Sequence, residues 1–420
     1  MTTTKNNEHK KLNFSSEREQ SQACLNSAEH EKNQGRKVLN VPNLRFPEFQ
    51  GKWEYFLIND VCSEFKSGKN IKADSVFECG EYPVYGGNGL RGYTSSYNHE
   101  GSYVLIGRQG ALCGNVRSVY GKTYITEHAI AVAGNEKSNT SFLHYLFLKM
   151  NLGQYSDQSA QPGLAVNKLL KLKVALPIIS EQTKIAKLLS LLDERISTQS
   201  KIIDKLQSLI KGLEDNLLDN PLWKKTYLRS FMQFFSTNSL SWEQLSYKEG
   251  AIRNLHYGLI HGFQTRGINS ASLPMIKNEA IPKQYTLCQV GDVAFADASE
   301  DTGEIAKSVE FVDTIEGDTI CGLHTIHGRD IKNRTVVGFK GFAFNSRYFH
   351  NQIKRLAQGT KVFSITANNL SSCYVYLPEM DTQTVIVRLL KSYEEQLIID
   401  RMIFKQYEKQ KQYLLRQMFI

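Results

Sequence analysis

The sequence predicts an α+β protein with two globular domains, each followed by one long helix, and with the two helices packed as an antiparallel coiled coil. Two observations support this. Residues 164–189 align without a gap on residues 365–390, and ten of these twenty-six positions are identical, where composition alone would give about one or two. Each copy then continues into a long apolar seam. A period this long indicates a duplicated domain with a pseudo-two-fold relation between its copies.

The N-terminal residues 1–37 are rich in Lys, Asn, Glu, Gln and Ser and contain few apolar residues. Such a segment cannot bury enough surface to offset the loss of chain entropy on folding. We expect it to be a disordered polar tail, with ordered structure beginning at Val38 and an extended entry through Pro42 and Pro47.

The first globular domain is expected at 38–178, where short strand-like runs such as 103–106 and 129–132 alternate with turns. The strongest turn signal is the Gly-Gly-Asn-Gly run at 86–89. Apolar spacing over 141–150 predicts a helix. This mixture is typical of a small α/β domain, and a second one is expected at 241–379.

Weaker matches extend the repeat upstream. Trp53-Glu54 and Trp242-Glu243 each precede an apolar run, and His128 matches His324 at an offset of 196. We therefore align Trp242 with Trp53 and assign 221–240 to a linker.

The first long helix is expected at 179–220, with Ser180 as its N-cap. Apolar residues then follow a four-three spacing over roughly 50 Å, as in a coiled coil, at Ile185, Leu189, Leu192, Ile196, Gln199, Ile203, Leu206, Ile210, Leu213 and Leu217. The second helix, 380–420 with Asp381 as its cap, repeats the seam at Ile386, Leu390, Tyr393, Leu397, Asp400, Phe404, Tyr407, Lys411, Leu414 and Met418.

Both seams carry a polar residue at the same internal step: Gln199 in the first helix and Asp400 in the second. In an antiparallel pair these two residues would meet, whereas a slipped register would bury each against hydrocarbon. Polar seam residues can fix register at a cost in stability. The alternative is that either side chain turns out to solvent.

Composition limits the possible partners. A formal net charge of +9, a pI near 9.0, 20 Tyr and 21 Phe suit a nucleic-acid partner, although a solvated basic surface would give the same charge. The seven cysteines are scattered and form no C-x-x-C pair, which favours a reducing compartment. No apolar run is long enough to span a membrane and no signal peptide is visible, so we expect a cytoplasmic protein without membrane contact.

Catalytic motifs are missing from the sequence, so we expect no catalytic residue and no cofactor in this chain. Gly121-Lys122-Thr123 ends like a phosphate-binding loop, but Val116 stands where its first glycine belongs. Residues 220–223 (NPLW) lack the second proline of an adenine methyltransferase motif. No lysine follows the carboxylates at 297–304 with the spacing usual in a metal-dependent nuclease.

A metal site is also not expected. Cys321, His324 and His327 recur every third residue, but on one strand this spacing puts neighbours on opposite faces. No second ligand cluster completes a tetrahedral set.

The remaining candidates are loop residues suited to contact with duplex DNA. Long planar donors beside glycines can approach a groove closely, and Arg pairs with guanine while Asn and Gln pair with adenine. The candidates in the first domain are Asn88, Arg91, Tyr93, Arg108, Gln109 and Gln161. Those in the second are Gln264, Arg266, Ser299, Glu300, Arg329 and Lys361. For each residue, a surface or turn role is at least as plausible.

Several short motifs, in this order, resemble a known family. They are LRFPEF at 44–49 ahead of Trp53, YGGNG at 85–89, IGRQG at 106–110, Leu176-Pro177 followed by Gln182 and Ile185, and GDV at 291–293. From about residue 40 to 420 the chain resembles the specificity (S) subunit of type I restriction-modification systems. The polar tail and the stretch 221–240 depart from the family pattern.

The resemblance implies two target-recognition domains that each read one half of a split, asymmetric sequence in double-stranded DNA, separated by an antiparallel helical spacer. It also implies two methyltransferase (modification) subunits, which bring S-adenosylmethionine, and restriction/translocase subunits, which bring ATP and Mg²⁺ chemistry. The chain itself would direct adenine methylation and restriction without catalysing either. Alternatives from other classes are a self-contained DNA methyltransferase or nuclease with an unrecognised site, and a coiled-coil adaptor that does not bind DNA.

Overall fold

The computed structural model describes residues 40–420 apart from 158–161, 264, 314 and 316. The expected tail at 1–37 lies outside the described residues. The described residues form two compact units: the first comprises those up to Asp193 together with Gln410–Ile420, and the second lies within Glu194–Lys409. Within the described residues, no helix is both long and apolar enough to cross a membrane.

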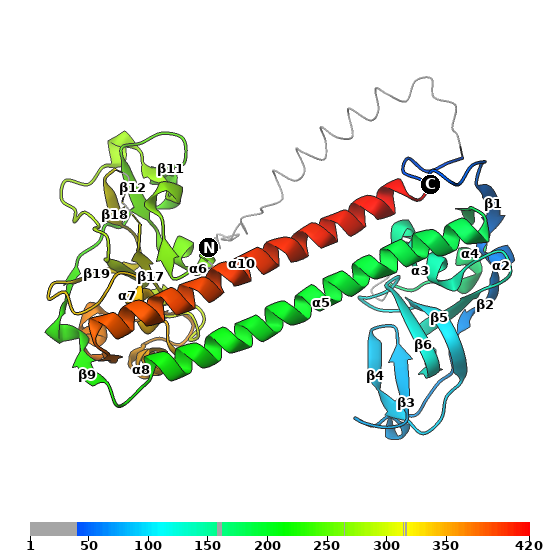
Figure 1. Cartoon of the computed structure of the whole chain (residues 1–420), viewed down its shortest axis with the longest axis horizontal. Helices are drawn as coiled ribbons and strands as arrows, with labels where there is room; N and C mark the ends of the chain where they lie inside the picture. Colours follow the sequence, from blue (N-terminus) through cyan, green and yellow to red (C-terminus); the bar gives the residue numbers. More distant parts are fainter. Residues whose placement is uncertain (1–39, 158–161, 264, 314, 316) are drawn as a thin grey trace, which may run out of the picture. The chain divides into compact units, whose positions relative to one another are not determined.

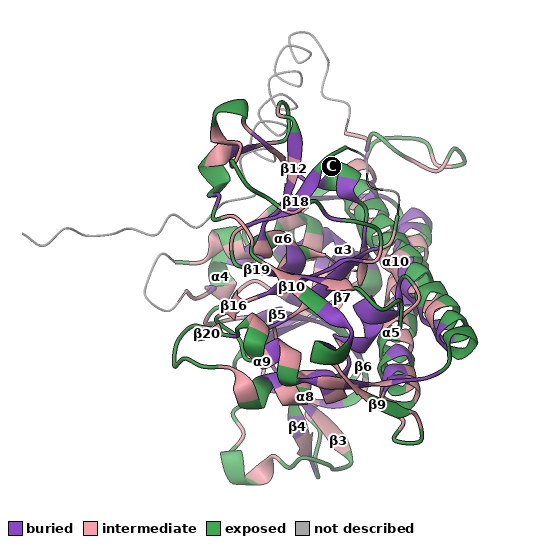
Figure 2. Ribbon diagram, turned by 90° about the vertical axis from the view of Figure 1, so that its left-hand side faces the viewer, coloured by how far each residue is buried: buried purple, intermediate pink, exposed green. Residues whose placement is uncertain are grey.

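The first unit is built on a six-stranded mixed sheet with the order β2-β7-β5-β6-β3-β4 and a separate β1–β8 pair (Figure 1). Strand β7 is buried along most of its length (Figure 2). The strands are β1 (Glu54–Leu57), β2 (Cys62–Ser67), β3 (Tyr82–Gly86), β4 (Gly89–Thr94), β5 (His99–Gly107), β6 (Val116–Ile125), β7 (Ala129–Gly134) and β8 (Lys173–Leu176). The helices are α2 (Ile58–Val61), α3 (Thr140–Met150) and α4 (Val166–Leu169).

Helix α3 covers the sheet and confirms the helix expected at 141–150. It begins where the Asn139 side chain accepts a hydrogen bond from Phe142 N at 3.1 Å, which satisfies one of the free donors of the first turn. The Phe142 ring lies 6.1 Å from Trp53 and 5.1 Å from Phe419. The C-terminal residues are therefore part of the core of this unit.

The second unit contains a five-stranded sheet with the order β10-β19-β15-β17-β13 and a four-stranded sheet with the order β11-β14-β12-β18. Two ribbons, β16–β20 and β9–β21, complete it. The strands are β9 (Lys224–Tyr227), β10 (Met232–Phe235), β11 (Leu245–Ser246), β12 (Ile252–Leu255), β13 (Gly267–Ile268), β14 (Met275–Ile276), β15 (Val293–Ala296), β16 (Ala298–Ser299), β17 (Ser308–Phe311), β18 (Thr319–Cys321), β19 (Thr325–Asp330), β20 (Phe363–Ser364) and β21 (Tyr374–Leu377). The short helices are α6 (Tyr257–Gly262), α7 (Phe339–Ala343), α8 (Arg347–Leu356) and α9 (Ala367–Ser372).

The sequence repeat is also a structural repeat. Helix α9 starts 201 residues after α4, and β21 starts 201 residues after β8, as 367 − 166 and 374 − 173 both show. The long helices α5 (Ile179–Leu218) and α10 (Met380–Gln417) start with the same offset. Their expected caps, Ser180 and Asp381, lie inside the first turn, because the helices already begin at Ile179 and Met380.

The upstream alignment is wrong for Trp242. Strand β1 follows Trp53 and pairs with β8, while its counterpart β9 follows Trp223 and pairs with β21. Trp242 lies instead in a short 3-10 helix beside the four-stranded sheet. The segment 221–240 is not a linker, since it contains β9 and β10, and both strands pair with strands of the second globular part.

A repeated glutamine joins each long helix to its own domain. Gln182 donates to Lys137 O at 2.9 Å and Pro177 O at 2.8 Å, and it accepts from Asn139 N at 2.8 Å. Its counterpart Gln383 makes the same set of bonds to backbone groups, donating at 2.9 and 3.0 Å and accepting at 3.0 Å. Both side chains are buried. The matched Gln in the sequence repeat is therefore a structural clamp.

Helices α5 and α10 pack antiparallel, as the sequence predicts (Figure 1). All twenty seam positions named above are buried or half-buried. Within the first unit Lys411 Nζ lies 2.5 Å from Asp193 Oδ1. Within the second unit Gln199 Nε2 donates to Asp400 Oδ1 at 2.7 Å. The residue numbers of the contacting partners therefore decrease along α10 as they increase along α5, which is the pattern of an antiparallel pair.

The Gln199–Asp400 contact lies inside the seam, with the two residues 8% and 7% exposed. Gln396 Nε2 also donates to Asp400 Oδ2 at 3.2 Å. Gln199 and Asp400 therefore meet, as an antiparallel pair requires. We propose that this contact fixes the register of the two helices. A slipped pairing would leave both polar groups without partners.

A second polar contact ties the helices to the second globular part. Arg266, just before β13, places its guanidinium nitrogens 3.0 Å from Glu214 of α5 and 3.0 Å from Glu394 of α10. Burial raises the pKa of both carboxyls, and Arg266 partly offsets this rise. One arginine therefore neutralises acidic groups from both helices.

We expect Asp400→Leu to lower the free energy of unfolding by about 1–3 kcal/mol, because the Gln199 amide would face hydrocarbon. The double variant Gln199→Leu/Asp400→Leu should recover most of this loss. Urea denaturation followed by circular dichroism measures both, with Gln207→Leu at an exposed position of α5 as control. A double variant no more stable than Asp400→Leu would contradict the register proposal.

We expect Arg266→Met to destabilise the second unit by about 3 kcal/mol at neutral pH, because two buried carboxylates lose their counter-charge. A carboxyl whose folded pKa is raised loses stability as pH rises from its unfolded toward its folded pKa. The deficit should therefore shrink on acidification toward pH 5. Thermal melts at several pH values measure this, with exposed Arg355→Met on α8 as control. A deficit that does not change with pH would refute the role of the carboxylates.

Candidate nucleic-acid interface

Three loops of the first unit meet at one end of its sheet: the β3–β4 turn, the loop after β5 and the loop before β7. Arg108 N donates to His128 O at 2.9 Å, and Thr126 N donates to Tyr85 O at 2.9 Å. A Cβ atom at Gly87 would lie 2.7 Å from His128 O, and one at Gly107 would lie 3.0 Å from Gly87 O. Glycine is therefore required for these backbones to approach one another.

Most of the predicted first-domain residues lie on or beside these loops. Asn88, Arg91 and Gln109 are exposed, Arg108 is half-buried, and Tyr93 is a half-buried residue of β4. Gln109 pairs with Gly163 through an isolated bridge. Gln161 lies outside the described residues.

Arg117 is a candidate that the sequence reasoning missed. It is exposed on β6 opposite Leu105, and its guanidinium lies 3.2 Å from the position of a Cβ at Gly89. Arg91 flanks the same turn, with its Cδ 2.9 Å from a Cβ position at Gly86. The turn is therefore bordered by two arginines, whose charge and long donors suit a phosphate or a base edge. Strand alternation alone could have placed Arg117 on an exposed face.

In the second unit, three of the predicted residues gather at the β16–β20 ribbon. Ser299 pairs with Phe363, Glu300 follows it and is exposed, and Lys361 is exposed in the adjoining turn. The Ser299 hydroxyl accepts from Asp301 N at 3.1 Å, so it also shapes this loop. Gln264 lies outside the described residues.

The structure argues against a base-reading role for Arg266 and Arg329. Arg266 is held by the helix carboxylates Glu214 and Glu394, as described above. Arg329 Nε and Nη2 donate to Asp292 at 2.8 and 2.7 Å, and Nη2 also donates to Leu287 O at 2.8 Å. Burial alone would raise the pKa of Asp292, but hydrogen bonds from Arg329 and His327 hold it below its usual value. We therefore remove both arginines from the candidate set.

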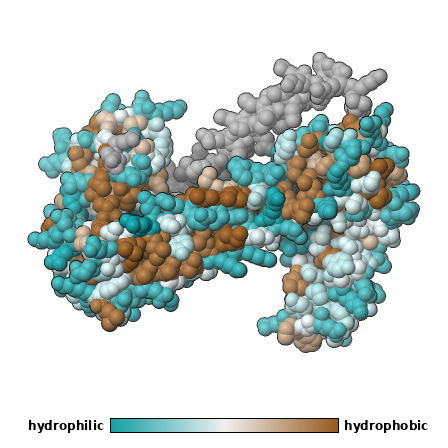
Figure 3. Space-filling model, viewed as in Figure 1, coloured by the Kyte–Doolittle hydropathy of each residue, from teal (hydrophilic) through white to brown (hydrophobic). Residues whose placement is uncertain are grey.

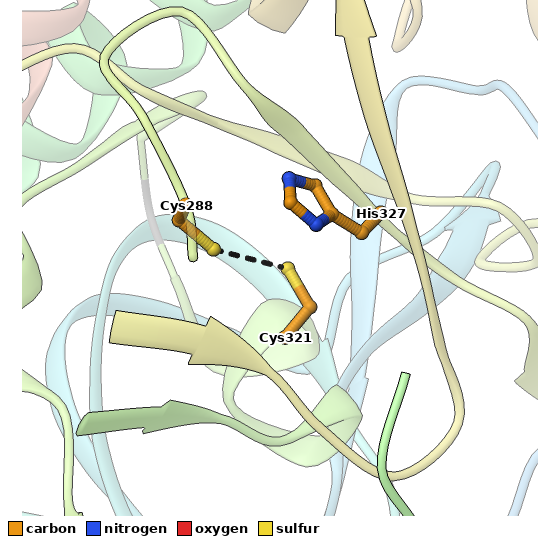
Figure 4. Close-up of side chains that lie close together, drawn as sticks. All are labelled: Cys288, Cys321 and His327. Carbon is orange, nitrogen blue, oxygen red and sulfur yellow. Dashed lines mark hydrogen bonds between the residues drawn. The ribbon is translucent and has the colours of Figure 1, made fainter. Parts of the chain in front are cut away.

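The prediction that Cys321, His324 and His327 lie on one strand is wrong. Cys321 ends β18 and His327 lies in β19, so the chain turns between them. His324 sits in that turn with φ 52° and contacts Asp297. The third member of the cluster is Cys288, whose sulfur lies 3.6 Å from that of Cys321 (Figure 4). These three buried side chains have their potential ligand atoms within 4.8 Å of one another.

Residues 50–208 match the family model of the type I restriction modification DNA specificity domain. Over 134 residues the chain is 45% identical to the type I restriction enzyme EcoprrI specificity subunit of Escherichia coli, a match that covers 31% of this chain and 33% of that protein. The chain thus spans about a third of the length of this relative. It is 25% identical over 405 residues to the type I restriction enzyme MjaVIII specificity subunit of Methanocaldococcus jannaschii, covering 89% of this chain and 92% of the relative.

Among solved structures, the type I restriction-modification S subunit from M. genitalium matches with a TM-score of 0.62 at 14% identity, covering 90% of this chain and 99% of that one. At this identity the match shows a shared fold. Residues 50–208 thus match the specificity domain of type I restriction-modification systems, and the chain shares the fold of a type I S subunit.

Proposed function

We propose that this chain is the DNA-reading subunit of a type I restriction-modification complex and that each globular part reads one half of a bipartite, asymmetric target. The observation that carries the proposal is a repeated scaffold with unlike loops. The strand–helix joints repeat with an offset of 201 residues, whereas the first unit has one six-stranded sheet and the second has two sheets of five and four strands. Like scaffolds with unlike loops suit independent reading of two different half-sites.

The loops of the first unit supply chemistry suited to duplex DNA. Arg91, Arg108 and Arg117 offer planar donors around the glycine turn, and Asn88 and Gln109 offer amides. In the second unit, Lys361, Ser299 and Glu300 supply a cation, a hydroxyl and a carboxylate that can accept from a cytosine amino group. A net charge of +9 supports attraction to the phosphate backbone.

We further propose that the chain is not an enzyme by itself and that methyltransferase subunits bind along its helices. A two-helix seam buries one stripe of each helix, so apolar residues on other faces call for a further partner. Ile202 of α5 is 43% exposed and Ile403, its equivalent at the 201 offset, is 37% exposed. Apolar side chains reach the surface along both helices (Figure 3). A shallow apolar groove on α10 is lined by Ile399, Met402, Ile403, Gln406 and Tyr407.

Two equivalent surfaces favour two methyltransferase subunits per chain. These would carry S-adenosylmethionine, and restriction/translocase subunits would carry ATP and Mg²⁺. In this division of labour the described chain supplies recognition and spacing, and its partners supply the covalent chemistry.

We expect Arg108→Ala to relax one position in one half of the methylated target, because losing a bidentate base contact removes about 1–3 kcal/mol of discrimination. Mapping methylated adenines in a host that carries the complete system measures this. Lys149→Ala, at an exposed position near the end of α3, is the control. Equal loss of methylation at all sites would assign Arg108 to phosphate, and relaxation in both halves would contradict independent reading.

Native mass spectrometry of the co-expressed assembly should show two methyltransferase subunits per chain. Ile202→Asp and Ile403→Asp should each release one of them, because a charge would face an apolar partner, whereas Ser197→Asp at an exposed position of α5 should not. A fully active one-to-one complex would overturn the stoichiometry. Methyl transfer or DNA cleavage by the chain alone would instead favour the self-contained enzyme.

A further inference from the structure

We propose that Cys288, Cys321 and His327 bind one zinc ion inside the second unit. The three side chains come from the segment before β15, the end of β18 and the middle of β19. All three are buried, with 7%, 2% and 1% of their surface exposed. This site is independent of the proposed DNA contacts and of the helix surfaces.

The sulfur geometry fits a tetrahedral ion. With Zn–S bonds of about 2.3 Å, tetrahedral angles place two sulfur ligands roughly 3.8 Å apart. The Cys288 and Cys321 sulfurs are 3.6 Å apart, and the histidine nitrogen completes a group whose atoms all lie within 4.8 Å. Little movement is needed for these atoms to share one ion.

The His327 imidazole is hydrogen-bonded to a carboxylate, as metal-ligating histidines usually are. His327 Nε2 lies 2.7 Å from Asp292 Oδ2, and Asp292 also accepts two bonds from Arg329. The carboxylate therefore acts as acceptor, so Nε2 donates to it, and in the neutral imidazole Nδ1 keeps its lone pair. Figure 4 shows a ring nitrogen of His327 turned toward the two sulfurs. A carboxylate that orients a histidine in this way is typical of zinc sites.

Charge balance also favours a divalent ion. An unpaired charge is costly to bury, and Asp292 is already paired with Arg329 at 2.7 Å. A Zn²⁺ ion would be balanced by two thiolates, formed as their protons leave to solvent on binding. Thiolate and imidazole ligands together suit zinc better than magnesium or calcium, which prefer oxygen.

The site would link the two sheets of the second unit. Cys288 N donates to Thr319 O at 2.8 Å, which holds the first ligand against β18 of the four-stranded sheet. His327 belongs to β19 of the five-stranded sheet. The described residues provide three ligands, so water or hydroxide would take the fourth tetrahedral position.

The test is a Co²⁺ titration of the full-length chain, reduced and stripped with chelator under anaerobic conditions. We expect one Co²⁺ per chain, with a thiolate-to-cobalt charge-transfer band and visible bands of tetrahedral intensity that Zn²⁺ abolishes. Cys288→Ser and Cys321→Ser should remove the charge-transfer band or strongly weaken it. Asp292→Asn should lower affinity by about 10–100-fold, as expected for the partner of a ligating histidine.

Two matched controls separate this site from other thiols and imidazoles. Cys373→Ser changes a buried cysteine outside the cluster, and His324→Asn changes the histidine that lies between the two ligands in sequence. Both should titrate like the unchanged chain. If a ligand variant folds poorly, hydrogen exchange of the unchanged chain still tests the proposal. Zinc should slow exchange in β18 and β19. Exchange in β5 and β7 of the first unit should stay the same.

The absence of a thiolate-to-cobalt band in the unchanged, reduced chain would overturn the proposal. An undiminished band in both cysteine variants would also overturn it. A Cys288–Cys321 disulfide in protein purified anaerobically would assign the sulfurs to a covalent link and exclude the ion.

Discussion

The shared apolar seam of α5 and α10 is the constraint on which the rest of the structure depends. Helix α5 spans 40 residues and α10 spans 38, and each carries a stripe of large, mostly apolar side chains that a polar residue interrupts. Most of the stability of such a helix comes from burying that stripe, because propensity alone stabilises it only marginally. Each helix therefore needs the other.

The seam also explains the polar residues around it. Gln199 and Asp400 pair inside it, and Arg266 neutralises one carboxylate from each helix. These contacts add less stability than an apolar core of the same volume would, but they penalise other pairings. The apolar seam stabilises the pair, and we propose that the polar contacts define its register.

The sequence was sufficient for features that depend on local periodicity. The four-three spacing predicted both long helices and their partnership, and the Gly-rich run at 86–89 predicted the turn between β3 and β4. Features set by distant residues could not be read in this way. Arg266 is held by Glu394, 128 residues away, and Cys288 meets Cys321 across 33 residues, so neither has a sequence signature. Trp242 was misaligned because a Trp-Glu pair matched Trp53 better than Trp223-Lys224 does, although strand pairing favours Trp223.

The repeated glutamine clamp has an evolutionary consequence. Gln182 and Gln383 bind backbone groups only, so the joint depends on the path of a loop and not on the side chains of the domain. A gene that recombines within the repeated segment would exchange one domain and keep an intact joint. New combinations of domains could then arise by crossover without a compensating change in the helices.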